Sequence, residues 1–283
     1  MTDSSQLDYE QYREAYHYRE GCRVGTNGLL GLAIAALSRR GPRQARVLNV
    51  GSGPEPQARA VVQAMLPHCH AIVLCEISPL FCEDYRQSSW YAENQNRIQI
   101  VCAGIDAVAA TKRQSDVFRA ASFDVIWCSH MAYHLRLADI PRVLQLFASL
   151  LVPDHGLSMI TIASVDSPIN VHLLKGLCPE YRLCEVLRAS LDESGCPWFS
   201  VPFVDRLPMS EEEAEELFRM FAEQDIFRHP DYFDPQKEAS EEDLRALERA
   251  VAATLKEALE PAGDRCIFTE YADCYLVKSR PAS

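Results

Sequence analysis

The chain has 283 residues, of which 48% are hydrophobic, 24% charged and 9% aromatic. This composition is typical of a globular protein with a sizeable core, and it excludes a minimal module. The 28 basic and 40 acidic residues give a formal net charge of -12. Because such a surface repels phosphate backbones and anionic membranes, we expect neither a nucleic-acid nor a membrane partner.

The first residues of the chain lack the basic and apolar regions of a signal peptide, and no apolar run is long enough to span a bilayer. The eleven cysteines include no CxxC pair, and three of them, Cys75, Cys102 and Cys128, lie within apolar runs. We therefore predict buried, reduced thiols and a cytoplasmic location.

Residues 8–37 are expected to form two helical stretches. In the first, Tyr9, Tyr12 and Tyr16 recur at spacings of three and four and so share one helix face. Such a face either packs in a core or walls a pocket. The break before the apolar helix LLGLAIAAL is predicted at three glycines, Gly21, Gly25 and Gly28.

Short apolar runs then alternate with helical stretches. Strands are predicted at residues 45–50, 71–76, 97–102, 123–130 and 156–164, and helices at 57–66, 81–91 and 140–151. Four of the strand runs are apolar nearly throughout, as in strands buried on both faces of a parallel sheet. The alternation predicts an α/β fold with a doubly wound, Rossmann-like, mostly parallel sheet.

The last third of the chain differs in pattern. It is expected to contain helices at 168–178 and 183–194, an aromatic strand at 198–204, an acidic helical stretch at 210–260 and a final strand at 266–278. The acidic run is interpreted as a solvated helix face, and the insertion at about 205–262 as a substrate lid. We expect one domain over 1–283, with a helical cap at 1–44, a cofactor-binding core at 45–165 and the rest of the sheet at 166–283.

The candidate cofactor site lies at the carboxyl ends of the strands, where doubly wound sheets bind ligands. Strand 45–50 is followed by Gly51, which permits a tight turn, Ser52, and Gly53, which lets the backbone approach a ligand. Glu76 ends the second strand and can accept both hydrogen bonds of a ribose 2′,3′-diol. Asp106, after the third strand, either holds an adenine amino group or caps the surface.

Pro56 stands where a dinucleotide-binding loop has its last glycine. The helix start therefore does not easily sit against a pyrophosphate, which favours a ligand with an adenosine but no diphosphate. S-adenosylmethionine is the common ligand of this kind. A short-chain reductase is further disfavoured because the chain has no Tyr-x-x-x-Lys pair on a helix after strand four or five.

Several segments together resemble a known family. VLNVGSGPEP, AIVLCEISP, RIQIVCAGID, FDVIWCSHMAYHL and GLSMITIAS resemble the motifs of class I S-adenosylmethionine-dependent methyltransferases. FDVIWCSHMAYHL with the DIP that follows it, and the opening DYEQYREAY, further resemble the histamine N-methyltransferase family. The resemblance implies cofactor contacts from the glycine loop with Glu55 at its third glycine position, from Glu76 and from Ser129. It implies substrate contacts from Tyr12, Tyr16, His130, Tyr133 and His134.

The chain departs from that family at the substrate. His130, Tyr133 and His134 stand where the histamine enzyme has Gln and two Tyr residues, so only a small-molecule acceptor is inherited. We expect an amine or imidazole nitrogen, with a carboxylate or hydroxyl oxygen as the alternative. His130 can act as a general base or donate a hydrogen bond to a carboxylate. His134 is expected to share its face if this turn is helical.

No metal site is predicted. His130 and His134 have a ligand-like spacing, but no Glu or Cys completes the set. His68, Cys69 and His70 precede the second strand, at the amino end of the sheet, and are interpreted as structural. A reading from another functional class is a non-catalytic cofactor-binding partner subunit. The GSG turn, Glu76 and the His/Tyr cluster argue against it. No pattern specifies an oligomeric state.

Overall fold

The computed structural model describes residues 24–39, 44–111, 116–233, 239–263 and 265–281. The chain folds as two compact units. Of the described residues, the first unit, called the core unit, contains those within 27–162, 185–201 and 274–281, and the second unit contains those within 24–26, 163–184 and 202–273. Tyr12 and Tyr16, predicted to contact substrate, lie outside the described residues.

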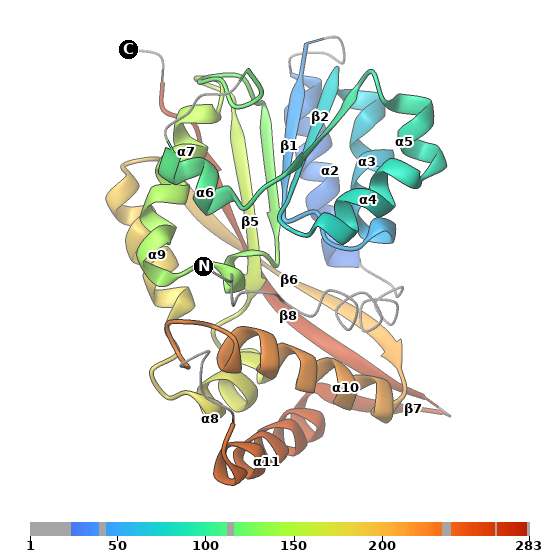
Figure 1. The fold of residues 1–283 in the computed structure, drawn as a ribbon, viewed down its shortest axis with the longest axis vertical. Coiled ribbons are helices and arrows are strands. Elements are labelled where there is room, and N and C mark those ends of the chain that lie inside the picture. Colours follow the sequence, from blue (N-terminus) through green and yellow to red (C-terminus); the bar gives the residue numbers. More distant parts are fainter. Residues whose placement is uncertain (1–23, 40–43, 112–115, 234–238, 264, 282–283) are drawn as a thin grey trace. The chain divides into compact units, whose positions relative to one another are not determined.

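The sheet has the predicted doubly wound topology. Its order is β3-β2-β1-β4-β5-β8-β6, and the strands β1 to β5 pair in parallel (Figure 1). These five strands are β1 (Arg46–Val50), β2 (Ala71–Glu76), β3 (Ile98–Cys102), β4 (Val125–Ser129) and β5 (Leu157–Ala163). The order reverses between β1 and β4, so the turns after these strands flank the switch point where such sheets bind ligands.

Burial along the strands follows their place in the sheet. β1, β2 and β4 are buried almost throughout, as their continuous apolar runs predict. β3 is the edge strand, and Gln99 and Cys102 on it are exposed. The prediction that Cys102 is a buried thiol was therefore wrong, because an edge strand has a neighbour on one side only.

Helices cover both faces of the sheet in the core unit (Figure 1). The helices on one face are α2 (Val24–Ser38), α3 (Glu55–Met65), α4 (Pro79–Gln87) and α5 (Ser89–Asn94), and those on the other are α6 (Ile105–Thr111) and α7 (Ile140–Leu150). Two helix predictions need correction. Gly25 and Gly28 lie inside α2 rather than in a break before it. The helix predicted at 81–91 is divided at Ser88, whose hydroxyl accepts the Tyr91 amide and so caps α5.

The second unit is mainly helical. It contains the π-helix η5 (Ile169–Leu174), α8 (Lys175–Leu177), α10 (Glu211–Ala222), the π-helix η6 (Glu223–Phe227), α11 (Glu241–Ala258) and the short strand β7 (Leu259–Ala262). Arg219 on α10 pairs with Glu215 at 2.8 Å and with Glu248 on α11 at 2.6 Å, which ties the two helices together. The acidic side chains Glu211, Glu212 and Glu216 are exposed, as predicted for a solvated face.

The late part of the chain differs from the prediction in three places. β6 (Trp198–Met209) extends five residues beyond the predicted strand, the helical stretch 210–260 is divided into α10 and α11, and β7 was not predicted. The insertion lies between β6 and β8 (Arg265–Lys278), as expected. Its role as a lid stays a prediction. α9 (Leu183–Ser194) matches its predicted bounds.

None of the helices in the described ranges is long and apolar enough to cross a membrane.

A pH-dependent stability follows from Asp225 in η6. Burial raises the pKa of Asp225 from 3.8 to about 8, so the folded protein keeps a proton that the unfolded chain releases between these values. The free energy of unfolding should therefore fall as pH rises through this window, by at most ~1.4 kcal/mol per pH unit. Asp225→Asn keeps a neutral side chain and should remove this slope. Urea denaturation across the window measures it, and identical slopes in the two proteins would contradict the assignment.

Candidate active site

The turn after β1 requires glycine at both of its glycine positions. Gly51 has φ +61° and Gly53 has φ +72°, in the left-handed region that other residues enter only with strain. A Cβ on Gly51 would also lie 2.4 Å from Cγ of Met131. Position 51 therefore requires glycine for two reasons, its left-handed backbone and the close approach of Met131. It lies at the edge where the turns after β1 and β4 come together.

Glu76, at the end of β2, is the buried acid of this edge. It is 4% exposed, and its two carboxylate oxygens accept the amides of Gly53 and Ser78, each at 3.0 Å. Burial raises the pKa of Glu76, while hydrogen bonds from backbone amides, Ser78 first, oppose the rise. A carboxylate has about four acceptor positions, so each oxygen can accept a further donor. Such donors would stabilise the charge that burial disfavours.

Two aromatic side chains donate hydrogen bonds to the same turn. The hydroxyl of Tyr85 on α4 donates to the carbonyl of Gly53, and Nε1 of Trp90 on α5 donates to Oε1 of Glu55 at 2.5 Å. The peptide groups of Gly53 are thus held on the amide side by Glu76 and on the carbonyl side by Tyr85. The sequence analysis missed both aromatics. Their only signal was their place on the helical stretch after the second strand.

Glu55 was predicted to contact the cofactor through its place in the glycine loop. In the structure its carboxylate is engaged by Trp90 and lies 3.7 Å from the guanidinium of Arg59. These contacts give it a role in supporting the turn.

Polar atoms beside the glycine turn remain available. Oε1 of Gln57 lies 3.0 Å from the position of a Cβ on Gly53, and the Nε2 atom of Gln57 is buried without a hydrogen-bond partner in the described part of the chain. The Nδ2 atom of Asn49 is in the same state, next to Ser52, whose hydroxyl donates to the Asn49 carbonyl at 3.4 Å. A buried donor without a partner is costly, so both positions favour an acceptor group here.

Asp106 lies in the first turn of α6, after β3. Its Oδ1 is 2.5 Å from the position of a Cβ on Gly104, and Cδ1 of Ile77 is 3.2 Å from the same point. The turns after β2 and β3 therefore meet at Gly104. Asp106 is half-buried, which is compatible both with an adenine contact and with a helix-terminal role.

The turn after β4 presents the His/Tyr cluster. Ser129 is the register partner of Thr161 on β5, and the amide of His130 donates to the Thr161 carbonyl at 2.9 Å. His130 then turns with φ +53°. Its ring stacks on that of Tyr133, with centroids 6.3 Å apart and an interplanar angle of 16°.

The turn after β4 is helical only from Ala132 onward. His134 was expected to share the face of His130 if the turn were helical. The turn contains the 3-10 helix η3, which spans only Ala132–His134. His130 precedes it with φ +53°, and the ring that stacks on the imidazole is that of Tyr133.

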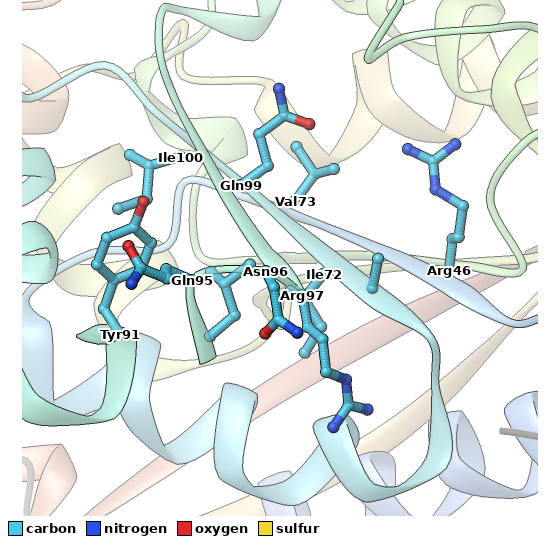
Figure 2. A pocket seen from close by; sticks show the side chains of 11 residues that line it. Arg46, Ile72, Val73, Tyr91, Gln95, Asn96, Arg97, Gln99 and Ile100 are labelled. Carbon is cyan, nitrogen blue, oxygen red and sulfur yellow. The ribbon is translucent and has the colours of Figure 1, made fainter. Parts of the chain in front are cut away.

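A cavity of about 390 Å³ lies elsewhere, among the amino-terminal ends of β1, β2 and β3 (Figure 2). Arg97, which points away from Gln99 and Val73 in Figure 2, donates to the carbonyls of Leu66, Cys69 and His70. Its guanidinium thus serves the backbone. The cavity lies at the opposite end of the strands from Glu76 and His130, so it does not belong to the candidate active site.

Among the described residues, no group of three or more His, Cys, Asp or Glu side chains could hold a metal ion. His68 ends the 3-10 helix η2 (Leu66–His68), Cys69 is buried, and β2 begins only at Ala71. These three residues therefore lie in the turn before β2.

Comparison with known proteins decides the family. A model described as a methyltransferase domain matches residues 25–191, which is more than half of the chain. The chain belongs to the class I S-adenosylmethionine-dependent methyltransferases. Among curated proteins, no sequence matches the chain.

Solved structures agree with this methyltransferase in fold. The YcgJ protein from Bacillus subtilis has 18% identity and a TM-score of 0.53, covering 89% of this chain and 98% of its own. The [4+2]-cyclase SpnF has 15% identity and a TM-score of 0.52, covering 98% and 97%. A protein from Galdieria sulphuraria, named as a sarcosine dimethylglycine methyltransferase, has 16% identity and a TM-score of 0.50, covering 92% and 87%.

The methyltransferase edge suits S-adenosylmethionine in its polar groups. Glu76 retains acceptor capacity for a ribose diol, whose hydroxyls are donors. The buried Nε2 of Gln57 is a donor suited to the carboxylate of the methionine part. Nothing in this edge resembles a diphosphate cradle, since the helix after the glycine turn begins with Glu55 and Pro56.

We expect Glu76→Ala to weaken the binding of both S-adenosylmethionine and its demethylated product. The loss of a charge-assisted contact to a diol costs roughly 1.5–3 kcal/mol, about tenfold to a hundredfold in affinity. Calorimetric titration measures it. Glu76→Gln retains one acceptor oxygen and should fall between the two proteins. Wild-type affinity in a folded Ala variant would remove Glu76 from the site.

Gly51→Ala should destabilise the protein more than Gly263→Ala. Both glycines have positive φ, but a Cβ on Gly263 meets nothing within 4 Å. The control should therefore lose only about 1–2 kcal/mol of stability, through the strain of a left-handed alanine. Gly51→Ala should lose a further ~1–3 kcal/mol of stability, because the added methyl group overpacks against Met131. Equal losses in urea denaturation would show that the turn can move away from Met131.

Proposed function

We propose that the protein transfers a methyl group from S-adenosylmethionine to an amine or imidazole nitrogen of a small molecule. The observation that carries this proposal is His130, held in a left-handed conformation at the end of β4. Three non-glycine residues with positive φ occur in the described residues: Ala121, His130 and Asp154. Ala121 and Asp154 precede β4 and β5, whereas His130 follows β4 at the edge that holds Glu76.

Backbone strain of this kind persists where the surroundings enforce it, and it concentrates at functional sites. In His130 the strain is offset by the amide hydrogen bond to Thr161 and by stacking on Tyr133. These contacts fix the imidazole plane. A fixed imidazole is the group most suited to exchanging a proton near neutral pH.

When bound, the cofactor would supply an electrophilic methyl group for in-line attack by the acceptor, with S-adenosylhomocysteine as the leaving group. The protein's part is to place the acceptor within about 3–3.5 Å of that methyl carbon and to manage the acceptor's proton. A protonated amine cannot attack, so His130 would take its proton as general base. Tyr133 would position the imidazole, and His134 would contribute a further polar contact to the acceptor.

A carboxylate or hydroxyl oxygen is the alternative acceptor. A carboxylate needs no base, and His130 would then orient it by donating a hydrogen bond. The narrower kinship with histamine N-methyltransferase rests on the sequence resemblance alone. Two structural neighbours are named for a small-molecule methyl transfer and for a [4+2] cyclisation, so the assay has to detect methyl transfer itself.

His130→Gln distinguishes the two acceptors. If the acceptor is a protonated nitrogen, turnover should fall by about 10²–10⁴ while cofactor affinity stays unchanged, because the base is lost. The remaining rate should then rise with pH as bulk water deprotonates the amine. If the acceptor is a carboxylate, mainly KM should rise, since Gln still donates a hydrogen bond.

The matched control is His70→Gln. His70 is exposed and lies at the amino end of β2, so its replacement should leave the kinetics unchanged. Methyl transfer from labelled S-adenosylmethionine to a panel of small amines, imidazoles and carboxylic acids identifies the acceptor. Wild-type kinetics of His130→Gln on that acceptor would leave His130 as a packing residue and would overturn the proposed mechanism.

A further inference from the structure

Two cysteine side chains lie beside Glu76 on different elements. Cys102 on β3 is the register partner of Glu76 on β2. Cys82 on α4 places its Sγ 3.6 Å from the carbonyl oxygen of Glu76, and Sγ of Cys102 lies 4.0 Å from the carbonyl oxygen of Ile77. The two thiols thus contact consecutive carbonyl groups of one turn. The Cys102 thiol is also among the groups that raise the pKa of Cys82.

The two thiols differ in accessibility. Cys102 is exposed, whereas Cys82 is fully buried. Among the cysteines in the described ranges, Cys102 alone is exposed and Cys266 alone is half-exposed. Burial, and then the neighbouring Cys102 thiol, raise the pKa of Cys82, so Cys82 is a poor first nucleophile. An oxidant from solution therefore meets Cys102 first and finds a second thiol directly behind it.

We propose that Cys82 and Cys102 form a reversible disulfide when the protein meets hydrogen peroxide. The thiolate of Cys102 attacks one peroxide oxygen, the O–O bond breaks, and the released hydroxide takes a proton to leave as water. Cys102 is then a sulfenic acid. The sulfur of Cys82 attacks the sulfur of Cys102, the S–O bond breaks, and the hydroxide leaves as water with the proton of Cys82. Two thiols are oxidised by two electrons, and one peroxide is reduced to two waters.

The disulfide has a consequence for the proposed cofactor site, and this part rests on the proposed function. A disulfide requires the sulfurs to approach to ~2.05 Å with a restricted dihedral angle. Both sulfurs contact the turn that carries Glu76, so their approach shifts α4 against the end of β3 at that turn. A misplacement of about 1 Å in an active site can lower the reaction rate by two orders of magnitude. We expect oxidation to weaken cofactor binding by about tenfold, and a reducing thiol to restore it.

The disulfide is tested on the full chain by treatment with hydrogen peroxide, alkylation of the remaining thiols and peptide mass spectrometry. Wild-type protein should yield a linked Cys82–Cys102 peptide. In Cys82→Ser the sulfenic acid of Cys102 cannot be resolved and should be trapped by dimedone. Cys266→Ser, which removes the other accessible thiol of the described residues, should behave as wild type. Dimedone labelling of Cys102 in wild-type protein to the same extent as in Cys82→Ser would overturn the disulfide.

The effect on the site is tested by titrating S-adenosylhomocysteine into reduced and oxidised protein. Wild type should lose about tenfold in affinity on oxidation, and Cys82→Ser should lose less than twofold. Equal affinities of reduced and disulfide-linked wild type would overturn the coupling. If reduced protein binds no S-adenosylhomocysteine at all, the proposed function fails, and the mass spectrometry still decides the disulfide.

Discussion

The hydrogen bond between the Glu76 carboxylate and the Gly53 amide is the contact on which the rest of the edge depends. It joins the end of β2 to the turn after β1, the two neighbouring strands beside the switch point. The same carboxylate accepts the Ser78 amide and so sets the start of α4. Because α4 carries Tyr85, which donates to the Gly53 carbonyl, the contacts close a loop: strand, turn and helix each hold the next.

This closed set of contacts explains why the Glu76 carboxyl group is tolerated at a buried position. A buried carboxylate is costly unless donors surround it, and here backbone amides supply part of that compensation. The remaining acceptor capacity is what a diol would use. On the other side of the switch point, the Thr161 carbonyl holds His130 in its strained conformation. We thus propose that cofactor binding and chemistry reside in two turns, one after β1 and one after β4.

Periodicity in the sequence was sufficient for the parallel strands, because β1, β2 and β4 each bury a continuous apolar run. The same signal located Gly51, Glu76 and His130, since strand ends are the only positions where ligands meet a doubly wound sheet. Periodicity did not show that β3 is the edge strand, and so the exposure of Cys102 was missed. Nor did it show the supports from Tyr85 and Trp90, which depend on how α4 and α5 pack against the glycine turn.

The π-helices η5 and η6 and the 3-10 turn after β4 were missed for a related reason. Their apolar residues have a helix-like spacing, and only tertiary packing selects a different hydrogen-bond pattern. At His130 the imidazole stacks on Tyr133, a contact that periodicity did not indicate.

Calorimetric titration of the wild-type chain with S-adenosylhomocysteine and, under the same conditions, with NAD⁺ tests the central claim most directly. The claim is that the edge formed by the glycine turn and Glu76 binds an adenosine without a diphosphate. It predicts saturable binding of one S-adenosylhomocysteine per chain and no binding of NAD⁺. Binding of NAD⁺, or the absence of S-adenosylhomocysteine binding to folded protein, would contradict it.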